Sequence, residues 1–299
     1  MSTLGVGASG LLISIPSPSR NSLELGPLEL RAYGAMIALG VVAAVWMSRR
    51  RWQARGNDPE QISRIALWAV PAGLIGARLY HVITDWRRFA DDGWLEALAI
   101  WEGGLGIPGG MAAGILAGLW MMRRQGMDRG ETLAAIVPSL PLAQAVGRLG
   151  NWFNQELYGS PTDLPWGLEI EESHRHTGYS DAETFHPTFL YEALWNLALC
   201  VVLVMIDRRR RRRRLAAAGL VGDPRRVDRP GSILAFYVLG YGLGRLWIEA
   251  LRIDTASLLW GLRVNIWMSL VLIVSASLYL IVVRGRPKRS TSRDPLLPI

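Results

Sequence analysis

Three residue types are scarce in this chain, and each scarcity excludes a kind of site. Cys200 is the single cysteine among 299 residues, so the sequence allows no intramolecular disulfide and no thiolate cage for a metal. Four histidines are present, and His174 and His176 stand two apart in a polar loop without further ligands. Lys288 is the single lysine, so the net charge of +8 depends almost wholly on arginine. We therefore expect neither a metal nor a cofactor.

A secretory leader and internal repeats are also missing. No basic residue precedes Arg20, and the short apolar piece Leu11–Ile13 is soon followed by Pro16 and Pro18, which does not fit a signal peptide. We expect the chain to stay in the membrane through its own helices. The absence of an internal repeat argues against a transporter built from inverted repeats.

Long apolar runs dominate the sequence. Runs of about 20 residues alternate with arginine clusters, which is the pattern of membrane helices and their loops. Thirteen tryptophans and eight tyrosines suit interfacial belts. The sequence predicts an all-α integral membrane protein, one polytopic domain over residues 1–299. The seven expected membrane segments are 28–47, 62–80, 105–122, 132–146, 187–206, 233–251 and 262–283.

The arginine clusters also predict how the chain crosses the membrane. They follow the first, third, fifth and seventh segments, which places those ends in the cytoplasm and the N-terminus outside. The polar insert 160–185 is then extracytoplasmic. The arginine-rich loop 207–231 and a disordered basic tail, 284–299, are cytoplasmic. We interpret the run Arg208–Arg214 as solvated charge near lipid and expect no nucleic-acid partner.

The stretch Gly147–Gly159 reads GRLGNWFNQELYG and ends the fourth segment. An arginine, a carboxylate and three amides are more than interfacial anchoring requires. If the stretch is helical, Arg148, Asn151 and Gln155 share one face. Its glycines weaken a helix by about 1 kcal/mol each relative to alanine, so a bent or unwound segment is equally compatible with the sequence.

Charged residues also lie inside the sixth segment, where burial in a bilayer costs about 2.5–3.5 kcal/mol each on insertion scales. Tyr241, Arg245, Glu249 and Arg252 are spaced four, four and three apart, so they share a helical face. Arg245 and Glu249 can pair and lower each other's cost of burial. The pair is either structural or functional. A functional pair fits an enzyme, or a transporter or channel with an intramembrane Arg/Glu pathway.

Together, these residues resemble the bacterial prolipoprotein diacylglyceryl transferase family. The motif Gly147–Gly159 is the most specific part of the resemblance, which extends over most of the chain. Its other parts are Tyr33–Gly34, Gly76–Tyr80, Trp101–Leu105, His186–Glu192, Gly244–Glu249 and Arg252.

The resemblance implies an enzyme of the bacterial cytoplasmic membrane. Such an enzyme moves the diacylglyceryl group of phosphatidylglycerol onto the lipobox cysteine of a prolipoprotein, forming a thioether and releasing glycerol 1-phosphate. The implied partners are phosphatidylglycerol, the prolipoprotein and the lipid bilayer. The residues that we expect to be catalytic are Arg148, Asn151, Glu156, His186, Arg245 and Glu249. Those expected to bind substrate are Tyr33, Arg78, Gly104, Asn154, Gly159 and Arg252.

Several of these assignments have simpler alternatives. Tyr33 also fits an aromatic belt, and Arg78 could extend its charge outward to the interface. A membrane assembly factor without catalytic activity is a third functional class, after the transferase and the transporter. Thiol-dependent release of glycerol phosphate would separate the transferase from both.

The chemistry of the reaction suits the residues. Arginine grips phosphate oxygens through a planar fork, so Arg148 and Arg245 suit the lipid headgroup. A thiol, with a pKa of about 8.5, must lose its proton before it attacks. Many family members have a histidine where this chain has Pro108, which leaves His186 or Glu249 as the base. Alternatively, the two arginines lower the thiol pKa directly; we favour this, with Glu249 orienting the site and finally accepting the proton.

Overall fold

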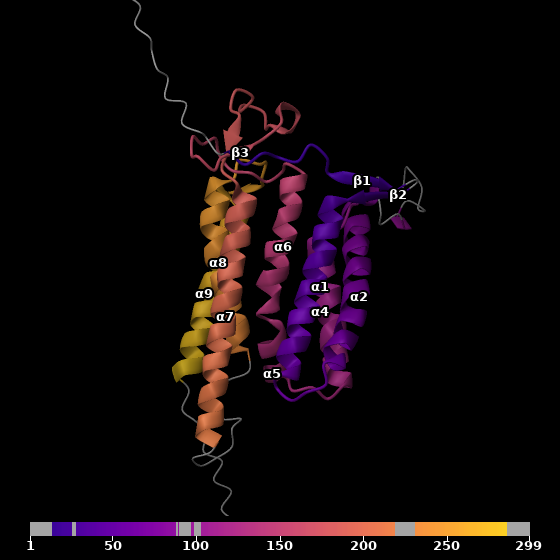
Figure 1. The fold of residues 1–299 in the computed structure, drawn as a ribbon, viewed down its shortest axis with the longest axis vertical. Helices are drawn as coiled ribbons and strands as arrows, with labels where there is room; N and C mark the ends of the chain where they lie inside the picture. Colours follow the sequence, from indigo (N-terminus) through magenta and orange to yellow (C-terminus); the bar gives the residue numbers. More distant parts are fainter. Residues whose placement is uncertain are drawn as a thin grey trace, which may run out of the picture.

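The computed structural model describes residues 14–25, 28–87, 89, 97–98, 103–218 and 231–285. Long helices run side by side and form an elongated bundle (Figure 1). The polar insert lies at one end of the bundle, which we call the insert end. The chain's arginine clusters at Arg49–Arg51, Arg123–Arg124 and Arg208–Arg214 lie at the opposite end, which we call the arginine end.

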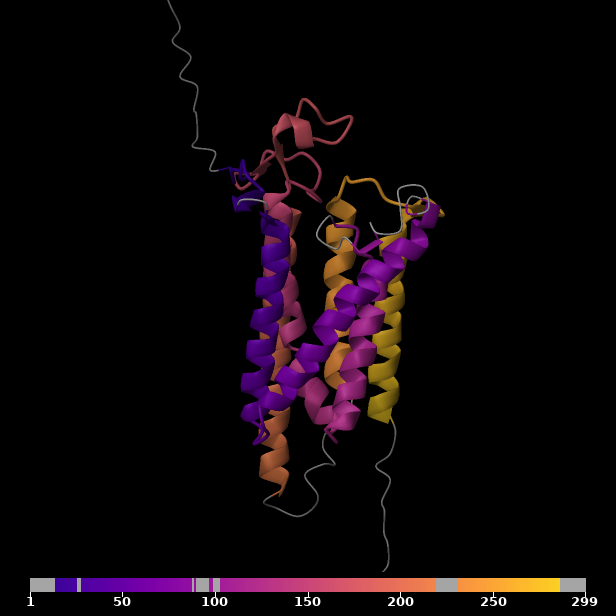
Figure 2. The same ribbon diagram turned by 90° about the vertical axis from the view of Figure 1, so that its right-hand side faces the viewer.

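Within the described residues, six helical stretches are long and apolar enough to cross a membrane, by length and composition. Five are single helices or parts of one, and the sixth combines the two short helices α5 and α6. The helices are α1 (Ala32–Gln53), α2 (Glu60–Thr84), α4 (Ile107–Arg124), α5 (Arg129–Ile136), α6 (Ser139–Phe153), α7 (Thr188–Ala218), α8 (Ser232–Leu251) and α9 (Val264–Gly285). The shorter α4 is not among the six, although it runs beside α2 in both side views (Figures 1 and 2).

The helices differ from the expected segments at their ends. α7 continues through the arginine run to Ala218 instead of ending near residue 206, because arginine is a good helix former where solvent can take its charge. Part of the expected loop 207–231 is therefore helix. The fourth segment is divided at Val137–Pro138, where α5 ends and α6 begins. Residues 219–230, 286–299 and the pair 101–102 lie outside the described residues.

Close backbone approaches hold neighbouring helices together. A side chain at Gly76 of α2 would place its Cβ only 2.6 Å from the carbonyl oxygen of Gly109 in α4. A Cβ at Gly40 of α1 would lie 2.8 Å from the carbonyl oxygen of Ala143 in α6. Small residues let membrane helices pack this closely and gain dispersion contacts. At these small residues, α4 packs closely against α2, and α6 packs closely against α1.

At the arginine end, ion pairs join three helices. The carboxylate of Asp207 in α7 accepts a hydrogen bond from Arg51 Nη2 at 2.8 Å and another from Arg55 Nη2 at 2.6 Å. Both arginines also donate to the backbone oxygen of Ala134 in α5, and Arg55 pairs with Glu131. These contacts bring α1 and the start of the fourth apolar segment to the side of α7.

The insert end has a small folded cap. Strands β3 (Leu168–Glu169) and β4 (Thr184–Phe185) pair antiparallel, and a short 3-10 turn, Glu172–His174, lies between them. Its core consists of Tyr158, Leu168, Ile170, Phe185 and Phe189. Burial raises the pKa of Tyr158, whose hydroxyl donates to the backbone oxygen of His174.

Two further short hairpins stand at the same end (Figure 1). β1 (Ser22–Leu25) pairs with β2 (Leu28–Arg31), directly before α1. β5 (Leu258–Leu259) pairs with β6 (Leu262–Arg263), directly before α9. The N-terminal segment also crosses the insert, because Ile15 exchanges backbone hydrogen bonds with Gly167 and Glu169.

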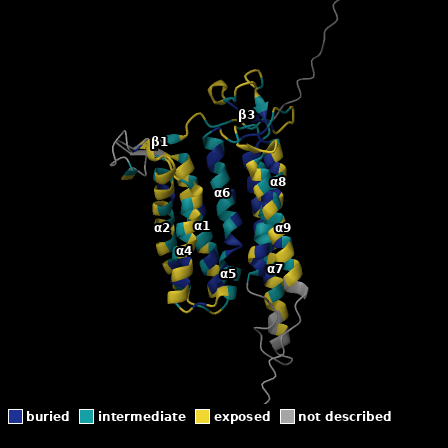
Figure 3. Ribbon diagram, turned by 180° about the vertical axis from the view of Figure 1, so that it is seen from behind, coloured by how far each residue is buried: buried dark blue, intermediate teal, exposed yellow. Residues whose placement is uncertain are grey.

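Large apolar side chains cover the outside of the bundle. Leu67 and Ile83 of α2, Leu116 of α4 and Val271 of α9 are all more than half exposed, and exposed residues follow the outer helix faces (Figure 3). An exposed apolar surface of this extent suits lipid rather than water. Many of the buried polar residues lie instead on α6, α7 and α8 or directly after them, and Asn151, Glu192 and Glu249 are toward the insert end.

Candidate functional site

The motif helix α6 carries the first part of the site to the insert end. α6 continues through Gly147 and Gly150 to Phe153, so the helical alternative is confirmed for Gly147–Phe153, whereas the rest of the stretch is not helical. Arg148 Nη1 donates to Asn151 Oδ1 at 3.3 Å. Asn151 Nδ2 in turn donates to Glu156 Oε1 at 2.8 Å, and Asn154 Nδ2 reaches the same oxygen at 3.1 Å. The amides therefore link Arg148 to Glu156.

The turn after α6 is held in a strained conformation. Gln155 and Leu157 have φ angles of 51° and 60°, which non-glycine residues rarely adopt. Gln155 does not share the face of Arg148. Its side-chain amide donates a hydrogen bond to the backbone oxygen of Pro18 and accepts one from the backbone N–H of Glu171. Sparsely populated backbone conformations cost of order 1–3 kcal/mol and cluster at functional sites; here they turn Glu156 back toward Asn151.

Glu192 of α7 connects the two arginines that the sequence singles out. Its Oε2 lies 2.5 Å from Arg148 Nε, and its Oε1 lies 3.1 Å from Arg245 Nη1. The carboxylate is buried. One side chain of α7 therefore sets the spacing between a guanidinium of α6 and a guanidinium of α8.

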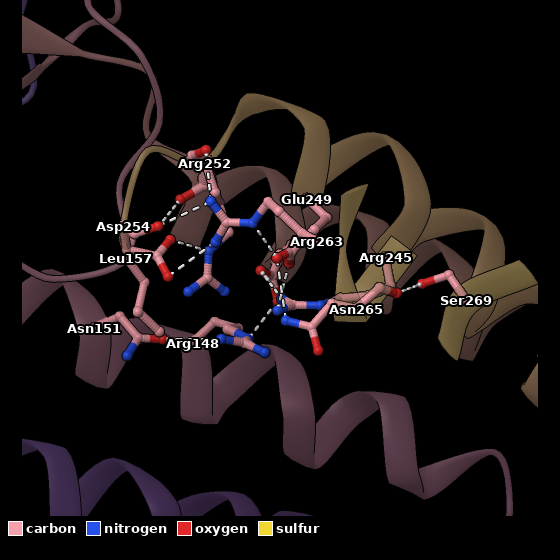
Figure 4. Close-up of polar contacts among 12 residues, drawn as sticks. Arg148, Asn151, Leu157, Arg245, Glu249, Arg252, Asp254, Arg263, Asn265 and Ser269 are labelled. Carbon is pink, nitrogen blue, oxygen red and sulfur yellow. Dashed lines mark hydrogen bonds and ion pairs between the residues drawn. The ribbon is translucent and has the colours of Figure 1, made fainter. Parts of the chain in front are cut away.

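Glu249 lies deeper in the same group and is fully buried, at 0% exposure. Arg245 Nη2 lies 2.7 Å from its Oε2, so the predicted pair is confirmed. This contact is an ion pair without hydrogen-bond alignment, because Oε2 accepts no hydrogen bond within the described part of the chain. Arg263 Nε and Asn265 Nδ2 donate to Oε1 at 2.6 and 3.1 Å (Figure 4).

A second carboxylate fixes the segment between α8 and α9. The carboxylate of Asp254 accepts a hydrogen bond from Arg252 Nε at 2.7 Å and another from Arg263 Nη2 at 3.0 Å. Burial by itself raises the pKa of Asp254, but the hydrogen bond from Arg252 and the charges of both arginines outweigh it and lower the pKa. Arg263 Nη1 also donates to the backbone oxygens of Arg252 and Asp254. Arg263 thus joins this segment to Glu249.

Gly159 brings the end of the motif against α8. Its N–H donates to the backbone oxygen of His186, and the next N–H, of Ser160, donates to Leu251 at the end of α8. A Cβ on Gly159 would lie 2.8 Å from His186 Cβ and 3.1 Å from the Leu251 oxygen. Only glycine allows the motif, the start of α7 and the end of α8 to meet here.

Three other expected residues come from the part of the chain that precedes the motif. Tyr33 of α1 packs against the motif, since a Cβ on Gly150 would come within 2.7 Å of its ring. Arg78 is buried and donates to the carbonyl oxygen of Gly103 at 2.6 Å, so it does not extend outward. Gly104, with a φ of 68°, leaves room for His81 and Arg78. Arg78 therefore holds the glycine-rich loop before α4.

The described cluster balances its own charge. It contains four arginines, Arg148, Arg245, Arg252 and Arg263, and four carboxylates, Glu156, Glu192, Glu249 and Asp254. The positive potential that we expected the arginine pair to apply to a thiol is thus offset by the neighbouring acids. In the described residues, no group of three or more His, Cys, Asp or Glu could hold a metal ion.

Four residues of the site were not among the predicted site residues: Glu192, Asp254, Arg263 and Asn265. Arg263 stands one residue inside the expected seventh segment, and its charge at that place was a usable signal. Asp254 and Asn265 carry no comparable signal, because polar residues are ordinary at helix ends. Glu192 was noticed at the start of the fifth segment but received no role.

The comparison with known proteins agrees with this geometry. The sequence profile of the prolipoprotein diacylglyceryl transferase family matches residues 20–282. The chain belongs to this family. Its relatives include phosphatidylglycerol–prolipoprotein diacylglyceryl transferases from several bacteria. The enzyme of Streptomyces griseus is 44% identical to this chain, and the match covers 95% of this chain and 82% of the relative. The enzyme of Frankia alni is 48% identical, and the match covers 91% of this chain and 68% of the relative. The enzyme of Cutibacterium acnes is 44% identical, and the match covers 92% of this chain and 88% of the relative.

In this diacylglyceryl transferase, Pro108 is part of a helix start. It occupies the first turn of α4, where a missing N–H costs nothing. His186, the remaining imidazole candidate, places Nδ1 3.2 Å from the hydroxyl of Tyr191. Trp166 donates to the same hydroxyl at 3.0 Å. The cluster's described ion pairs and side-chain hydrogen bonds do not include His186.

Replacing His186 with glutamine should therefore lower the transfer rate less than about tenfold, or roughly 1.4 kcal/mol of barrier. Glutamine keeps a polar group near Tyr191, and the backbone bonds to Gly159 are independent of the side chain. The rate–pH profile of the variant and the parent tests this. Near-complete loss at neutral pH that higher pH restores would identify His186 as the base.

Proposed function

We propose that this chain transfers the diacylglyceryl group of phosphatidylglycerol to the lipobox cysteine of prolipoproteins. The cluster that joins Arg148 to Arg245 through Glu192 supports this proposal most directly. It supplies fixed guanidinium groups, largely screened from water, at one end of an apolar bundle. The printed names of the relatives specify the same two substrates.

In the proposed reaction, the thiolate attacks a glycerol carbon of the lipid. A carbon–sulfur bond forms, and the bond between that carbon and the phosphate oxygen breaks. Glycerol 1-phosphate leaves with the electron pair and carries an additional negative charge. Arg148 and Arg245 stabilise this charge through bidentate contacts, and they act more strongly where little water is present.

The remaining residues orient these two arginines. Glu192 fixes their spacing, Asn151 and Glu156 align Arg148, and Glu249 holds Arg245 against α8. Tyr33, Asn154 and Gly159 line the approach from α1 and from the turn after α6. Glu249 orients the site and accepts the proton that the thiol loses when it becomes the attacking thiolate.

Purified protein tests the proposal with labelled phosphatidylglycerol and a lipobox peptide. We expect release of glycerol 1-phosphate together with a thioether product, and neither when serine replaces the peptide's cysteine. A transporter or a non-catalytic assembly factor would release no glycerol phosphate in a thiol-dependent way. Absence of both products from folded protein would contradict the proposal.

We further propose seven spans, with α4 as the third, in the bacterial cytoplasmic membrane. The insert end then faces outward and the arginine end faces the cytoplasm, as the arginine asymmetry favours. The site thereby opens to the side on which secreted precursors emerge. In this proposal, residues 1–299 form a single membrane domain.

Cysteine labelling in intact cells tests this orientation. A Ser173→Cys variant in a Cys200→Ser background should react with an impermeant reagent before lysis, because Ser173 is exposed in the insert. The matched Arg212→Cys variant, exposed at the arginine end, should react only after lysis. Labelling of Ser173→Cys that requires lysis would overturn the topology.

A further inference from the structure

A basic groove lies at the arginine end, on the opposite end of the bundle from the cluster. It has a volume of about 450 Å³ and opens between the start of α2 and the end of α4. Its lining residues are Gln61, Arg64, Trp68, Trp120, Met121, Arg124 and Gln125. No carboxylate is among them.

The two arginines of the groove are available to an anion. Glu60 is the acid nearest to Arg64 along α2, and it pairs with Arg49 of α1 at 2.5 Å. Arg124 lies over the ring of Trp120, with its guanidinium carbon 5.4 Å from the ring centroid. Both side chains therefore keep donors that a phosphate could accept.

The groove also has an apolar wall and an unused acceptor. Trp68 and Trp120 meet edge to face at 5.3 Å and are 51% and 43% exposed. Such rings belong at the level of lipid headgroups. Gln125 Nε2 donates to the backbone oxygen of Gln61, whereas its buried Oε1 accepts no hydrogen bond within the described residues. A headgroup hydroxyl could donate to this oxygen.

We propose that this groove binds one anionic phospholipid from the leaflet at the arginine end. The phosphate lies between Arg64 and Arg124, and the acyl chains run along the exposed apolar residues Leu67 and Leu116. The bound lipid is not the molecule that reacts, because the proposed reaction takes place at the insert end. Its role is to hold the α2–α4 pair at the membrane surface.

Native mass spectrometry of the full chain tests the proposal with defined mixtures of phosphatidylglycerol and phosphatidylcholine. The Arg64→Gln/Arg124→Gln variant should retain one fewer phosphatidylglycerol per chain, with apparent affinity about tenfold weaker. Arg123→Gln is the matched control, because Arg123 is exposed on the same helix but does not line the groove. Its lipid retention should equal that of the parent.

Repeating each measurement in an Arg148→Ala background distinguishes lipid bound in the groove from lipid bound at the reactive site. The loss caused by the groove variant should be the same in both backgrounds. Transfer by the groove variant in detergent with saturating phosphatidylglycerol should match that of the parent, which also shows that the variant is folded. Equal losses in Arg123→Gln, or equal retention of phosphatidylcholine by the parent, would overturn the proposal.

Discussion

Replacing Arg148 with alanine should lower diacylglyceryl transfer at least a thousandfold while the protein remains folded in the membrane. Arg148 is one of two guanidinium groups that Glu192 holds together, and no other described side chain takes its place beside Asn151. Removing one preorganised donor for a developing oxyanion typically costs a factor of about 10²–10³. Loss of a full charge at a site poor in water should reach or exceed the upper value.

Lysine at position 148 should restore little of the lost activity. A point charge cannot reproduce the planar fork, and it would contact either Glu192 or Asn151 rather than both. Arg87→Ala is the control, because Arg87 is exposed near the insert end. The labelled-lipid assay measures all three variants, with thermal unfolding as the folding check. Near-normal turnover of Arg148→Ala would remove Arg148 from the phosphate clamp.

The second large effect concerns Arg245 and Glu249, which should act as one unit. Each of Arg245→Gln and Glu249→Gln should lower transfer by two to three orders of magnitude, roughly the value of one preorganised charge. The double variant should be no worse than the harsher single. Glu249 is fully buried between Arg245 and Arg263, so removal of either partner already disrupts the arrangement.

A double-mutant cycle on the transfer rate measures this coupling. The control cycle pairs Arg245 with Glu156, which contacts Asn151 rather than Arg245, and should show weaker coupling. Additive losses for Arg245 and Glu249 would instead mean that the two side chains have independent roles.

The sequence by itself determined the membrane class, most helix positions and the family. Apolar runs of spanning length predicted α8 within one residue at its start, since Ile233 was expected and Ser232 is observed. The spacing of Arg245 and Glu249 predicted their contact, because residues four apart on a helix always lie on neighbouring turns. These features depend on local periodicity, which a single sequence displays.

Helix ends and turns were harder to predict from the sequence. The strained turn at Gln155 and Leu157 has no glycine at either position to announce its left-handed backbone. The continuation of α7 to Ala218 was missed because a charged run was interpreted as a loop. In both cases the sequence contains the residues but not the contacts that decide between competing conformations.

Only the tertiary structure decided which charges neutralise one another. Glu192 joins Arg148 to Arg245 across three helices, and Arg263 reaches Glu249 from the chain segment beyond α8. Such pairs depend on how helices rotate and pack, and sequence spacing carries no information about contacts between different helices. The same packing turned an expected positive site into a balanced cluster, because the carboxylates beside its four arginines offset the cost of taking their charges out of water.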